Sequence, residues 1–331
     1  MRKREFRSDT MTMPTEAMRE AMRGAELGDD VCREDPTVGR LEAEAAKITG
    51  KEAALFVPSG TFGNQCAIRS HTSPGDELIV CEIAHVIEHE AGAAAALSGV
   101  QTRTIAPRNG DYITAEEIMP RLRVVDDIHH PKTALIVLEN ATSFGTVMPL
   151  EEMRRVKELA REHGIPVHLD GARLFNAALS MGVRPAAVAS EVESVTFCLS
   201  KGLGAPVGSM LCGASVFIER ARRVRKMMGG GMRQAGVLAA AGLIAISDGA
   251  GRLGEDHDNA KLLAGRLAKI QGIVIDPGKV QTNMVFCRID FPGRTEEGLA
   301  GFLKERGILT YDPGPWGLRF VTSREVTSGD V

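Results

Sequence analysis

Short runs of apolar residues alternate with longer stretches of helical pattern along most of this 331-residue chain, and this alternation limits its possible folds. The runs contain few polar residues, as expected for strands whose two faces are both buried. They occupy residues 53–57, 77–81, 133–138, 167–170, 195–199 and 209–212. Strands separated by helices are typical of a mostly parallel sheet. The sequence therefore predicts an α/β architecture.

Helical stretches separate several of these runs. Residues 150–163 place apolar side chains on one stripe and end before Gly164 and Pro166, which are typical of a helix end. Residues 216–228 also predict a helix. A further helix is predicted over 114–123, where Pro120 should kink or end it.

The pattern changes near residue 250. Helices are predicted there over 255–270 and 295–306, and strands over 273–275, 284–288 and 318–321. This mixture is typical of a smaller α+β unit. We therefore predict a large domain over residues 1–248 and a small domain over residues 249–331. The N-terminal segment 1–14 is expected to pack with the small domain and the functional site.

Charge and composition exclude several classes of protein. The chain has 40 Lys and Arg against 43 Asp and Glu, and this balance offers no basic surface for nucleic acid or an anionic membrane. Aromatic residues make up only 4% of the chain, which disfavours a platform that stacks bases. No apolar run approaches the ~18 residues of a membrane-spanning helix. The six scattered cysteines favour reduced thiols in a cytoplasmic protein.

The first motif with chemical meaning follows the first apolar run. Residues 58–64 read PSGTFGN, a turn of small residues that opens a helical stretch. Free backbone N–H groups at a helix N-terminus are suited to phosphate, which makes Gly60 and Thr61 candidate ligands. The alternative is a plain strand-to-helix turn with a Ser or Thr cap.

Two further motifs follow the ends of later runs. Asp170 ends one run and precedes Arg173 by three positions, and Lys201 follows the next run and precedes several glycines. Ligands of parallel sheets gather at the carboxyl ends of strands, where a carboxylate can hold a pyridinium N–H or Mg²⁺. A lysine beside a buried strand is costly to bury as an ammonium ion, which favours a Schiff-base lysine. The alternatives are a helix-capping aspartate and an exposed loop lysine.

The three motifs complement one another. A phosphate-binding turn, an acidic partner for a ring nitrogen and a Schiff-base lysine are the groups that pyridoxal 5'-phosphate requires. Their combination therefore predicts a pyridoxal-phosphate enzyme.

His85 and His89 form a competing pattern. Residues 85–89 read HVIEH, which matches the inverted zinc-protease motif, and on one helix the two histidines would share a face. A zinc hydrolase is therefore a remote alternative. The alanine-rich stretch 91–96 instead favours a tightly packed helix of small residues, and we predict no metal.

Motifs of a known family occur in this chain in the same order. They are residues 7–10 (RSDT), 28–30 (GDD), 34–37 (EDPT), 58–61 (PSGT), 168–173 (HLDGAR), 199–202 (LSKG) and 229–234 (GGGMRQ). Over nearly its whole length the chain resembles the low-specificity L-threonine aldolases, which have fold type I among pyridoxal-phosphate enzymes. The resemblance implies an aldehyde-lyase that cleaves L-threonine, allo-threonine or related β-hydroxy-α-amino acids to glycine and an aldehyde.

The resemblance also implies roles for residues around the cofactor. Lys201 holds the cofactor covalently, and Asp170 pairs with its pyridinium nitrogen. Gly60 and Thr61 cradle the phosphate. His85 stacks on the ring and is the candidate base for the β-hydroxyl proton.

Other implied roles concern the substrate and a second subunit. Ser8, Arg173 and Arg319 bind the substrate carboxylate, since guanidinium groups suit a carboxylate, and Arg173 also belongs to the cofactor site. Arg233 and the basic helix that ends at Lys226 reach the phosphate region of a neighbouring subunit. The family is usually a homotetramer with sites at dimer interfaces.

The chain departs from the family pattern in four places, and two of them are single residues: Cys32 stands where a tyrosine is common, and Ser323 stands where the family commonly has the histidine of Val-Thr-His. The family usually reads ENTHN after the run 133–138, whereas this chain reads ENATSFG over residues 139–145 and lacks the histidine that contacts the substrate hydroxyl. A final family helix has no counterpart after Val331. Because the region of the substrate side chain is altered, β-elimination or amino-acid racemisation on the same scaffold stays an alternative.

Overall fold

The computed structural model describes residues 3–108, 110–124 and 127–331. The strands are β1 Arg4–Glu5, β2 Ala53–Val57, β3 Glu77–Cys81, β4 Gln101–Ile105, β5 Thr133–Glu139, β6 Val167–Asp170, β7 Ser194–Cys198, β8 Ser209–Gly213, β9 Ile273–Val274, β10 Met284–Ile289, β11 Ile308–Leu309 and β12 Leu318–Val321. The helices are α1 Glu16–Arg23, α2 Pro36–Thr49, α3 Gly60–His71, α4 His85–Glu88, α5 Ala93–Ser98, α6 Ala115–Ile118, α7 Leu150–Glu162, α8 Leu174–Met181, α9 Pro185–Ala189, α10 Ser215–Met227, α11 Gly236–Ile244, α12 Leu253–Leu267 and α13 Glu296–Glu305.

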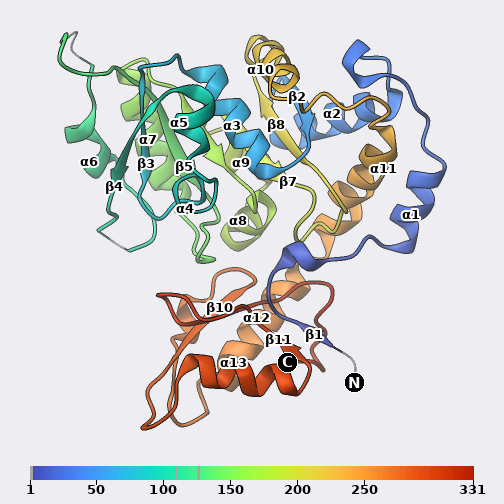
Figure 1. Ribbon diagram of the computed structural model, residues 1–331, viewed down its shortest axis with the longest axis vertical. Coiled ribbons are helices and arrows are strands. Elements are labelled where there is room, and N and C mark those ends of the chain that lie inside the picture. The colour runs from blue at the N-terminus through green and yellow to red at the C-terminus, as the bar shows by residue number, and fades with distance from the viewer. Residues whose placement is uncertain (1–2, 109, 125–126) are drawn as a thin grey trace.

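A seven-stranded sheet forms the centre of the larger unit, with the order β2-β8-β7-β6-β5-β3-β4. Strand β8 runs antiparallel to both of its neighbours, and the remaining neighbouring pairs are parallel. Helices surround this sheet, and a smaller unit lies to one side of it (Figure 1). The predicted α/β architecture with a mostly parallel sheet is therefore confirmed.

The six predicted strands all form, and each of their ends lies within one residue of its prediction. Their residues are almost entirely buried, because the strands lie inside the sheet with both faces covered. The sequence missed β4, which forms one edge of the sheet. Its sequence, QTRTI, has four polar residues before a single apolar one and is buried only at its last position, so it lacks the continuous apolar run of the other strands.

The predicted helices also form, with differences at two places. Helices α7, α10, α12 and α13 match their predictions, and α6 ends at Ile118, two residues before the proline at position 120. Residues 85–96 do not form one continuous helix. Instead α4 ends at Glu88, and α5 begins only after Ala91 and Gly92 adopt positive φ angles of 54° and 69°.

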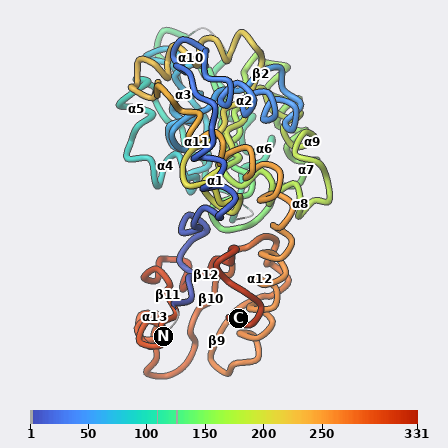
Figure 2. Tube along the Cα trace, turned by 90° about the vertical axis from the view of Figure 1, so that its right-hand side faces the viewer, coloured from blue at the N-terminus to red at the C-terminus, as the bar shows by residue number. Residues whose placement is uncertain are grey.

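The smaller unit has its own hydrophobic core and a three-stranded antiparallel sheet, ordered β12-β10-β9. The N-terminal segment, described from residue 3 onward, reaches this unit through the parallel pair β1 and β11 and through the buried side chain of Phe6. It passes between the larger and smaller units before the chain enters α1 (Figures 1 and 2). The predicted boundary after residue 248 falls in a short π-helical segment, Ala245–Gly249, and it stays a prediction.

Two further expectations concern membrane-spanning helices and the state of the cysteines. Among the described residues no single helix has the length and apolar character needed to cross a membrane. Gly236–Gly249 and Leu253–Leu267 reach that length and apolar composition only when taken together, and they are bent by 61° relative to each other. All six cysteines are free thiols, and Cys32 alone among them is exposed.

Candidate active site

The predicted cofactor residues follow the carboxyl ends of parallel strands. Gly60 begins α3 just after β2, His85 begins α4 after β3, and Lys201 follows β7. Asp170 is the last residue of β6 and pairs in register with Glu139, the last residue of β5. The parallel sheet thus brings residues from distant parts of the chain to one edge, where ligands of such sheets bind.

A cavity of about 540 Å³ lies at this edge. Five predicted residues line it, namely Ser8, His85, Arg173, Lys201 and Arg319. Its other lining residues are Thr10, Ile83, Glu88, His89, Ser143, Phe144, Phe286, Tyr311, Asp312, Gly314, Pro315, Trp316 and Gly317. The cavity therefore contains an amine, two guanidinium groups and two imidazoles supplied by both units of the chain.

The turn before α3 has the form expected of a phosphate site. Ser59 caps the helix, because its Oγ accepts a hydrogen bond from Phe62 N at 3.1 Å and its carbonyl accepts one from Gly63 N at 3.0 Å. This cap leaves the N–H groups of Gly60 and Thr61 at the positive end of the helix dipole. A Cβ atom on residue 60 would lie 2.7 Å from Sγ of Cys198, so only glycine fits there.

Asp170 is buried, with only 2% of its surface exposed. Its Oδ2 accepts a hydrogen bond from Asn64 Nδ2 at 2.8 Å, and its Oδ1 accepts one from the N–H of Ala172 at 3.0 Å. Within the described part of the chain no lysine or arginine forms an ion pair with it. A buried carboxylate is stabilised by a cationic partner, which a pyridinium N–H would supply.

The backbone of Lys201 is fixed while its side chain lines the cavity. Thr12 Oγ1 donates a hydrogen bond of 2.9 Å to the carbonyl of Lys201, which ties the lysine to the N-terminal segment. Among the described residues no carboxylate forms an ion pair with its amino group. The amino group is thus available for the aldehyde of a cofactor.

His85 is held at two points. Its Nδ1 lies 2.9 Å from Oε1 of Glu90, and its backbone N–H donates to Oε2 of Glu139 at 2.9 Å. The hydrogen bond to Glu90 raises the pKa of His85 above its ordinary value. Burial and the neighbouring His85 lower the pKa of His89.

The zinc alternative finds no support in this geometry. The centres of the His85 and His89 rings are 5.4 Å apart with an angle of 61° between their planes, and the helix expected to carry both ends before His89. In the described ranges the potential ligand atoms that lie within 4.8 Å of one another belong to His85, Glu90 and Asp170, without His89. Asn64 Nδ2 already bridges the carboxylates of Glu90 and Asp170, at 2.9 and 2.8 Å.

The two arginines of the cavity differ in their partners. Arg173 forms a bidentate pair with Asp9, whose oxygens accept from Nε at 2.8 Å and from Nη2 at 2.6 Å. Arg319 donates a 3.3 Å bond to the carbonyl of Arg7 and lies 5.6 Å from the ring centre of Tyr311. Burial, and then the nearby Arg173, lower the pKa of Arg319. Ser8 caps the turn that carries Asp9, since its Oγ accepts from Thr10 N at 3.2 Å.

Arg233 does not line this cavity. Its side chain is 59% exposed and pairs with Asp29 at 2.8 Å. The basic helix α10 instead lines a separate cavity of about 720 Å³, which also contains Arg33 and Gly231. One residue of that helix, Arg225, is buried and pairs with Asp30 at 2.7 Å, so it does not belong to the basic surface.

Sequence reasoning missed two groups of residues at the site. One consists of Asn64, Glu90 and Glu139, which lie around His85 and Asp170. Glu139 directly follows the predicted strand 133–138, so the rule that found Lys201 just after its strand would also have found Glu139. The other is a wall formed by four of the 14 aromatic residues of the chain, Phe144, Phe286, Tyr311 and Trp316. Phe144 lies 4.9 Å from Trp316 and 6.0 Å from Phe286 between ring centres. No local signal brings the wall together, because its members come from three separate segments.

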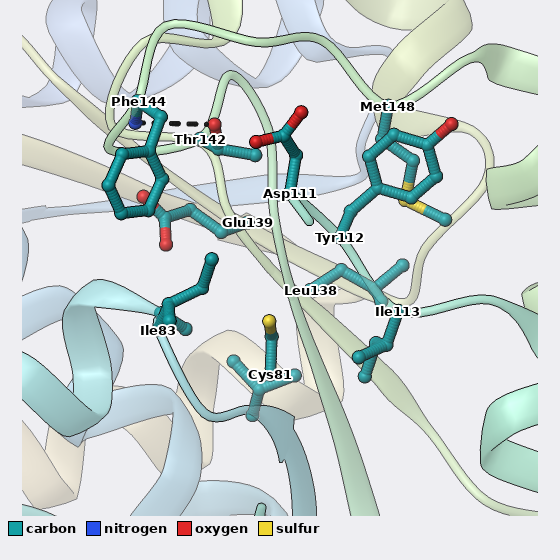
Figure 3. Close-up of a pocket in the computed structure, with 12 residues that line it drawn as sticks. Cys81, Ile83, Asp111, Tyr112, Ile113, Leu138, Glu139, Thr142, Phe144 and Met148 are labelled. Atoms are coloured by element: carbon teal, nitrogen blue, oxygen red, sulfur yellow. Dashed lines mark hydrogen bonds between the residues drawn. The ribbon is translucent and has the colours of Figure 1, made fainter. Parts of the chain in front are cut away.

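A small pocket of about 10 Å³ adjoins the cavity, and the two share Ile83 and Phe144 (Figure 3). Glu139 lines this pocket between those two residues. Burial, and then the adjacent charge of Asp170, raise the pKa of Glu139 to about 7. The ends of β5 and β6 therefore bring the carboxylates of Glu139 and Asp170 together, and the pKa of Glu139 responds to this proximity.

The sequence and fold match those of known proteins. The model of the β-eliminating lyase family matches residues 5–290. A low-specificity L-threonine aldolase of Arabidopsis thaliana is 44% identical over 100% of this chain and 94% of its own length, and one of Escherichia coli K12 is 43% identical over 92% and 90%.

Solved structures agree at the level of the fold. A threonine aldolase of Leishmania major superposes with a TM-score of 0.84 at 20% identity, covering 98% of this chain and 95% of its own. An L-allo-threonine aldolase of Listeria monocytogenes, named as putative, superposes with a TM-score of 0.79 at 20% identity, covering 98% and 91%. The predicted fold type I is thereby confirmed. The family match and the identity to the Arabidopsis and Escherichia proteins show that this chain is a lyase of the β-eliminating lyase family, in the group of the low-specificity L-threonine aldolases.

Proposed function

We propose that this chain is a pyridoxal-phosphate enzyme that cleaves L-threonine, allo-threonine or related β-hydroxy-α-amino acids to glycine and an aldehyde. The observation that carries the proposal is the 540 Å³ cavity, which unites Lys201, His85 and Arg319 beside the buried Asp170. The names of the relatives from Arabidopsis and Escherichia support the same substrate class.

The residues at this site fit the cofactor. Lys201 would hold its aldehyde carbon, Asp170 would pair with its ring nitrogen, and the N–H groups of Gly60 and Thr61 would face its phosphate. When bound, pyridoxal phosphate stabilises negative charge at the α-carbon of an attached amino acid.

The remaining side chains act on the substrate itself. Arg319 and Ser8 would bind its carboxylate, with Arg173 beside them. His85 would accept the β-hydroxyl proton, so that the oxygen can become the carbonyl of the leaving aldehyde as the Cα–Cβ bond breaks. The substituent on the β-carbon would contact the wall that contains Phe144 and Trp316.

We also propose a cytoplasmic homotetramer in which Arg233 reaches a neighbouring site. The exposed side chain of Arg233 and the basic cavity on α10 support this proposal, because both lie outside the chain's own active-site cavity. The free thiols of the six cysteines support a reducing compartment.

Lys201→Ala tests the function directly. The wild-type protein is expected to show a visible absorbance band that borohydride removes, and to release acetaldehyde and glycine from threonine. The variant should lose both the band and the activity, while Lys269→Ala, at an exposed position on the smaller unit, should keep the borohydride-sensitive band. Covalent cofactor binding and normal turnover by Lys201→Ala would refute the assignment.

Analysis of the products separates the alternatives. Pyruvate and ammonia from serine would indicate β-elimination, and interconversion of enantiomers without carbon–carbon cleavage would indicate racemisation. Activity that depends on stoichiometric zinc would indicate the hydrolase.

A further inference from the structure

Glu90 is a buried carboxylate to which the proposed function assigns no role. Its side chain has no exposed surface, yet it lies directly behind an imidazole that is 29% exposed in the cavity. Two consecutive residues of α3 donate hydrogen bonds to the Glu90 carboxylate. Asn64 Nδ2 donates to its Oε1 at 2.9 Å, and Gln65 Nε2 donates to its Oε2 at 2.6 Å.

These contacts determine which nitrogen of the His85 imidazole carries the proton. A carboxylate that accepts from Asn64, Gln65 and His85 is used as an acceptor at both oxygens, as suits its ionised form. Nδ1 of His85, 2.9 Å from Oε1, must then carry a hydrogen. In the neutral imidazole the other nitrogen, Nε2, consequently has the free lone pair.

The orientation of the ring is fixed as well. The backbone N–H of His85 donates to Glu139 from β5, while the side chain is bound to Glu90 from the segment after α4. Asn64 further connects Glu90 to Asp170, so the proposed base and the partner of the cofactor nitrogen share one buried hydrogen-bond network.

We propose that Glu90 is a positioning residue: it binds Nδ1–H of His85 and so makes Nε2 the atom that takes the β-hydroxyl proton from the substrate. This inference rests on the proposed function. The proton passes from the substrate oxygen to Nε2, and Glu90 keeps its own charge throughout.

The charged groups that face His85 set the expected pH dependence. Glu90 and Asp170 favour the protonated imidazole, and Lys201 opposes it. Two further titratable groups lie near His85. They are His89, from the same turn, and Glu139, which accepts the hydrogen bond from the backbone N–H of His85. Since the bond to Glu90 is the largest of the influences that raise the pKa of His85, its loss should lower that pKa.

The proton on His85 can be located in the unaltered enzyme. Solid-state ¹⁵N NMR of the cofactor-loaded protein, labelled at histidine and assigned with His85→Asn, is expected to show hydrogen on Nδ1 and none on Nε2 in the neutral ring. Hydrogen on Nε2 alone would overturn the proposal. This measurement needs neither turnover nor a variant at position 90.

Kinetics of Glu90→Gln provide the second test. A base must be neutral to accept a proton, so the acidic limb of kcat/KM for threonine cleavage should move to lower pH by about one unit or more when the carboxylate becomes an amide. The plateau value of kcat/KM is expected to fall about 10- to 100-fold, because the imidazole of His85 is held less firmly. Glu82→Gln, which changes an exposed glutamate outside the cavity, should leave the limb unchanged.

Two controls distinguish positioning from simple structural damage. Exchange of the α-proton of glycine uses Lys201 and the cofactor but no β-hydroxyl group, so Glu90→Gln should retain it. In a His85→Asn background the Glu90→Gln change should produce no further shift of the limb. Two outcomes would refute the role of Glu90. One is a folded Glu90→Gln variant whose acidic limb of kcat/KM does not move, and the other is an equal shift of that limb when Glu90→Gln is made in the His85→Asn background. A wild-type protein that releases no aldehyde would refute the proposed function, while the NMR measurement would still judge the contact.

Discussion

Single residues in the cavity differ in how free they are to bind a ligand. The guanidinium of Arg173 is engaged with Asp9 through Nε and Nη2, whereas Arg319 has a 3.3 Å bond to a carbonyl and the ring of Tyr311 nearby, with no carboxylate paired to it among the described residues. Arg319 is therefore the better placed of the two to bind an anionic ligand, and Arg173 acts beside it with its geometry already fixed.

Arg319→Lys should therefore raise KM for threonine by about tenfold or more with a smaller change in kcat, because an ammonium group cannot bind a carboxylate through two parallel hydrogen bonds. Steady-state kinetics measure the change. Arg306→Lys, at an exposed position on the smaller unit, should leave KM unaltered. An unchanged KM in Arg319→Lys would assign the carboxylate site to other residues.

His168 is a buried histidine that makes the stability of the fold depend on pH. It lies inside β6, contacts Ser194 Oγ at 2.9 Å and Asn64 Oδ1 at 3.3 Å, and burial lowers its pKa from 6.5 to about 3. Between these pH values the unfolded chain binds a proton at His168 that the folded chain does not. Acidification from pH 6.5 toward pH 3 therefore favours unfolding.

Replacing His168 by Gln should remove this contribution. The free energy of unfolding should depend less steeply on pH than in the wild type, by up to about 1.4 kcal/mol per pH unit, in denaturant titrations between pH 6 and 4. His129→Gln, in an exposed turn, should keep the wild-type slope. The difference in slope is the informative quantity, since Glu139 and Asp256, with raised pKa values, act in the opposite direction in both proteins.

At the scale of elements, the start of α3 is the most constrained junction of the site. Helix α3 begins at Gly60 directly after β2, and residue 60 packs against Cys198 at the end of β7. The close approach positions the N–H groups of the first turn above the ends of two strands. The phosphate turn therefore depends on a packing contact as well as on its own residues.

Gly60→Ala should weaken cofactor binding and destabilise the fold by about 1–3 kcal/mol, because its Cβ would meet the sulfur at 2.7 Å and move the helix. Cofactor titration and denaturant unfolding measure the two effects. Gly39→Ala is the matched control: this exposed glycine lies within α2 with nothing within 4 Å of its added Cβ, and the change should stabilise the protein by about 0.5–1 kcal/mol. Unaltered cofactor affinity in Gly60→Ala would place the phosphate elsewhere.

At the scale of the whole molecule, the site depends on contacts between distant parts of the chain. The N-terminal segment joins the smaller unit through β1, supplies Ser8 to the cavity and holds Arg173 through Asp9, while Arg319 lies on β12. Arg233 is exposed and does not line this cavity, so the role we propose for it needs a second subunit.

Mixing two inactive variants tests this sharing of residues. Lys201→Ala and Arg233→Ala should each be nearly inactive, but refolding them together should restore threonine cleavage, because a mixed dimer contains one site with both residues intact. Each variant refolded alone provides the control. No recovery, with mixed oligomers demonstrated by mass, would show that Arg233 does not act across the interface.

The local sequence was sufficient to determine the larger elements and the identities of several site residues. Continuous apolar runs predicted six strands, since a strand buried on both faces has no room for alternating polar residues. Asp170 and Lys201 were visible because a charged residue at the end of such a run is costly without a partner. The edge strand β4 escaped prediction because its exposure removes that constraint.

Only the tertiary structure decided which side chains meet. The sequence placed His85 on a helix shared with His89, but α4 ends at Glu88, and Glu90 in the segment after it binds His85 and Asn64. The pairing of Arg173 with Asp9 and the aromatic wall likewise join segments far apart in the chain. Apolar periodicity records whether a residue is buried, whereas the partner of a buried polar group depends on how the strands and helices pack.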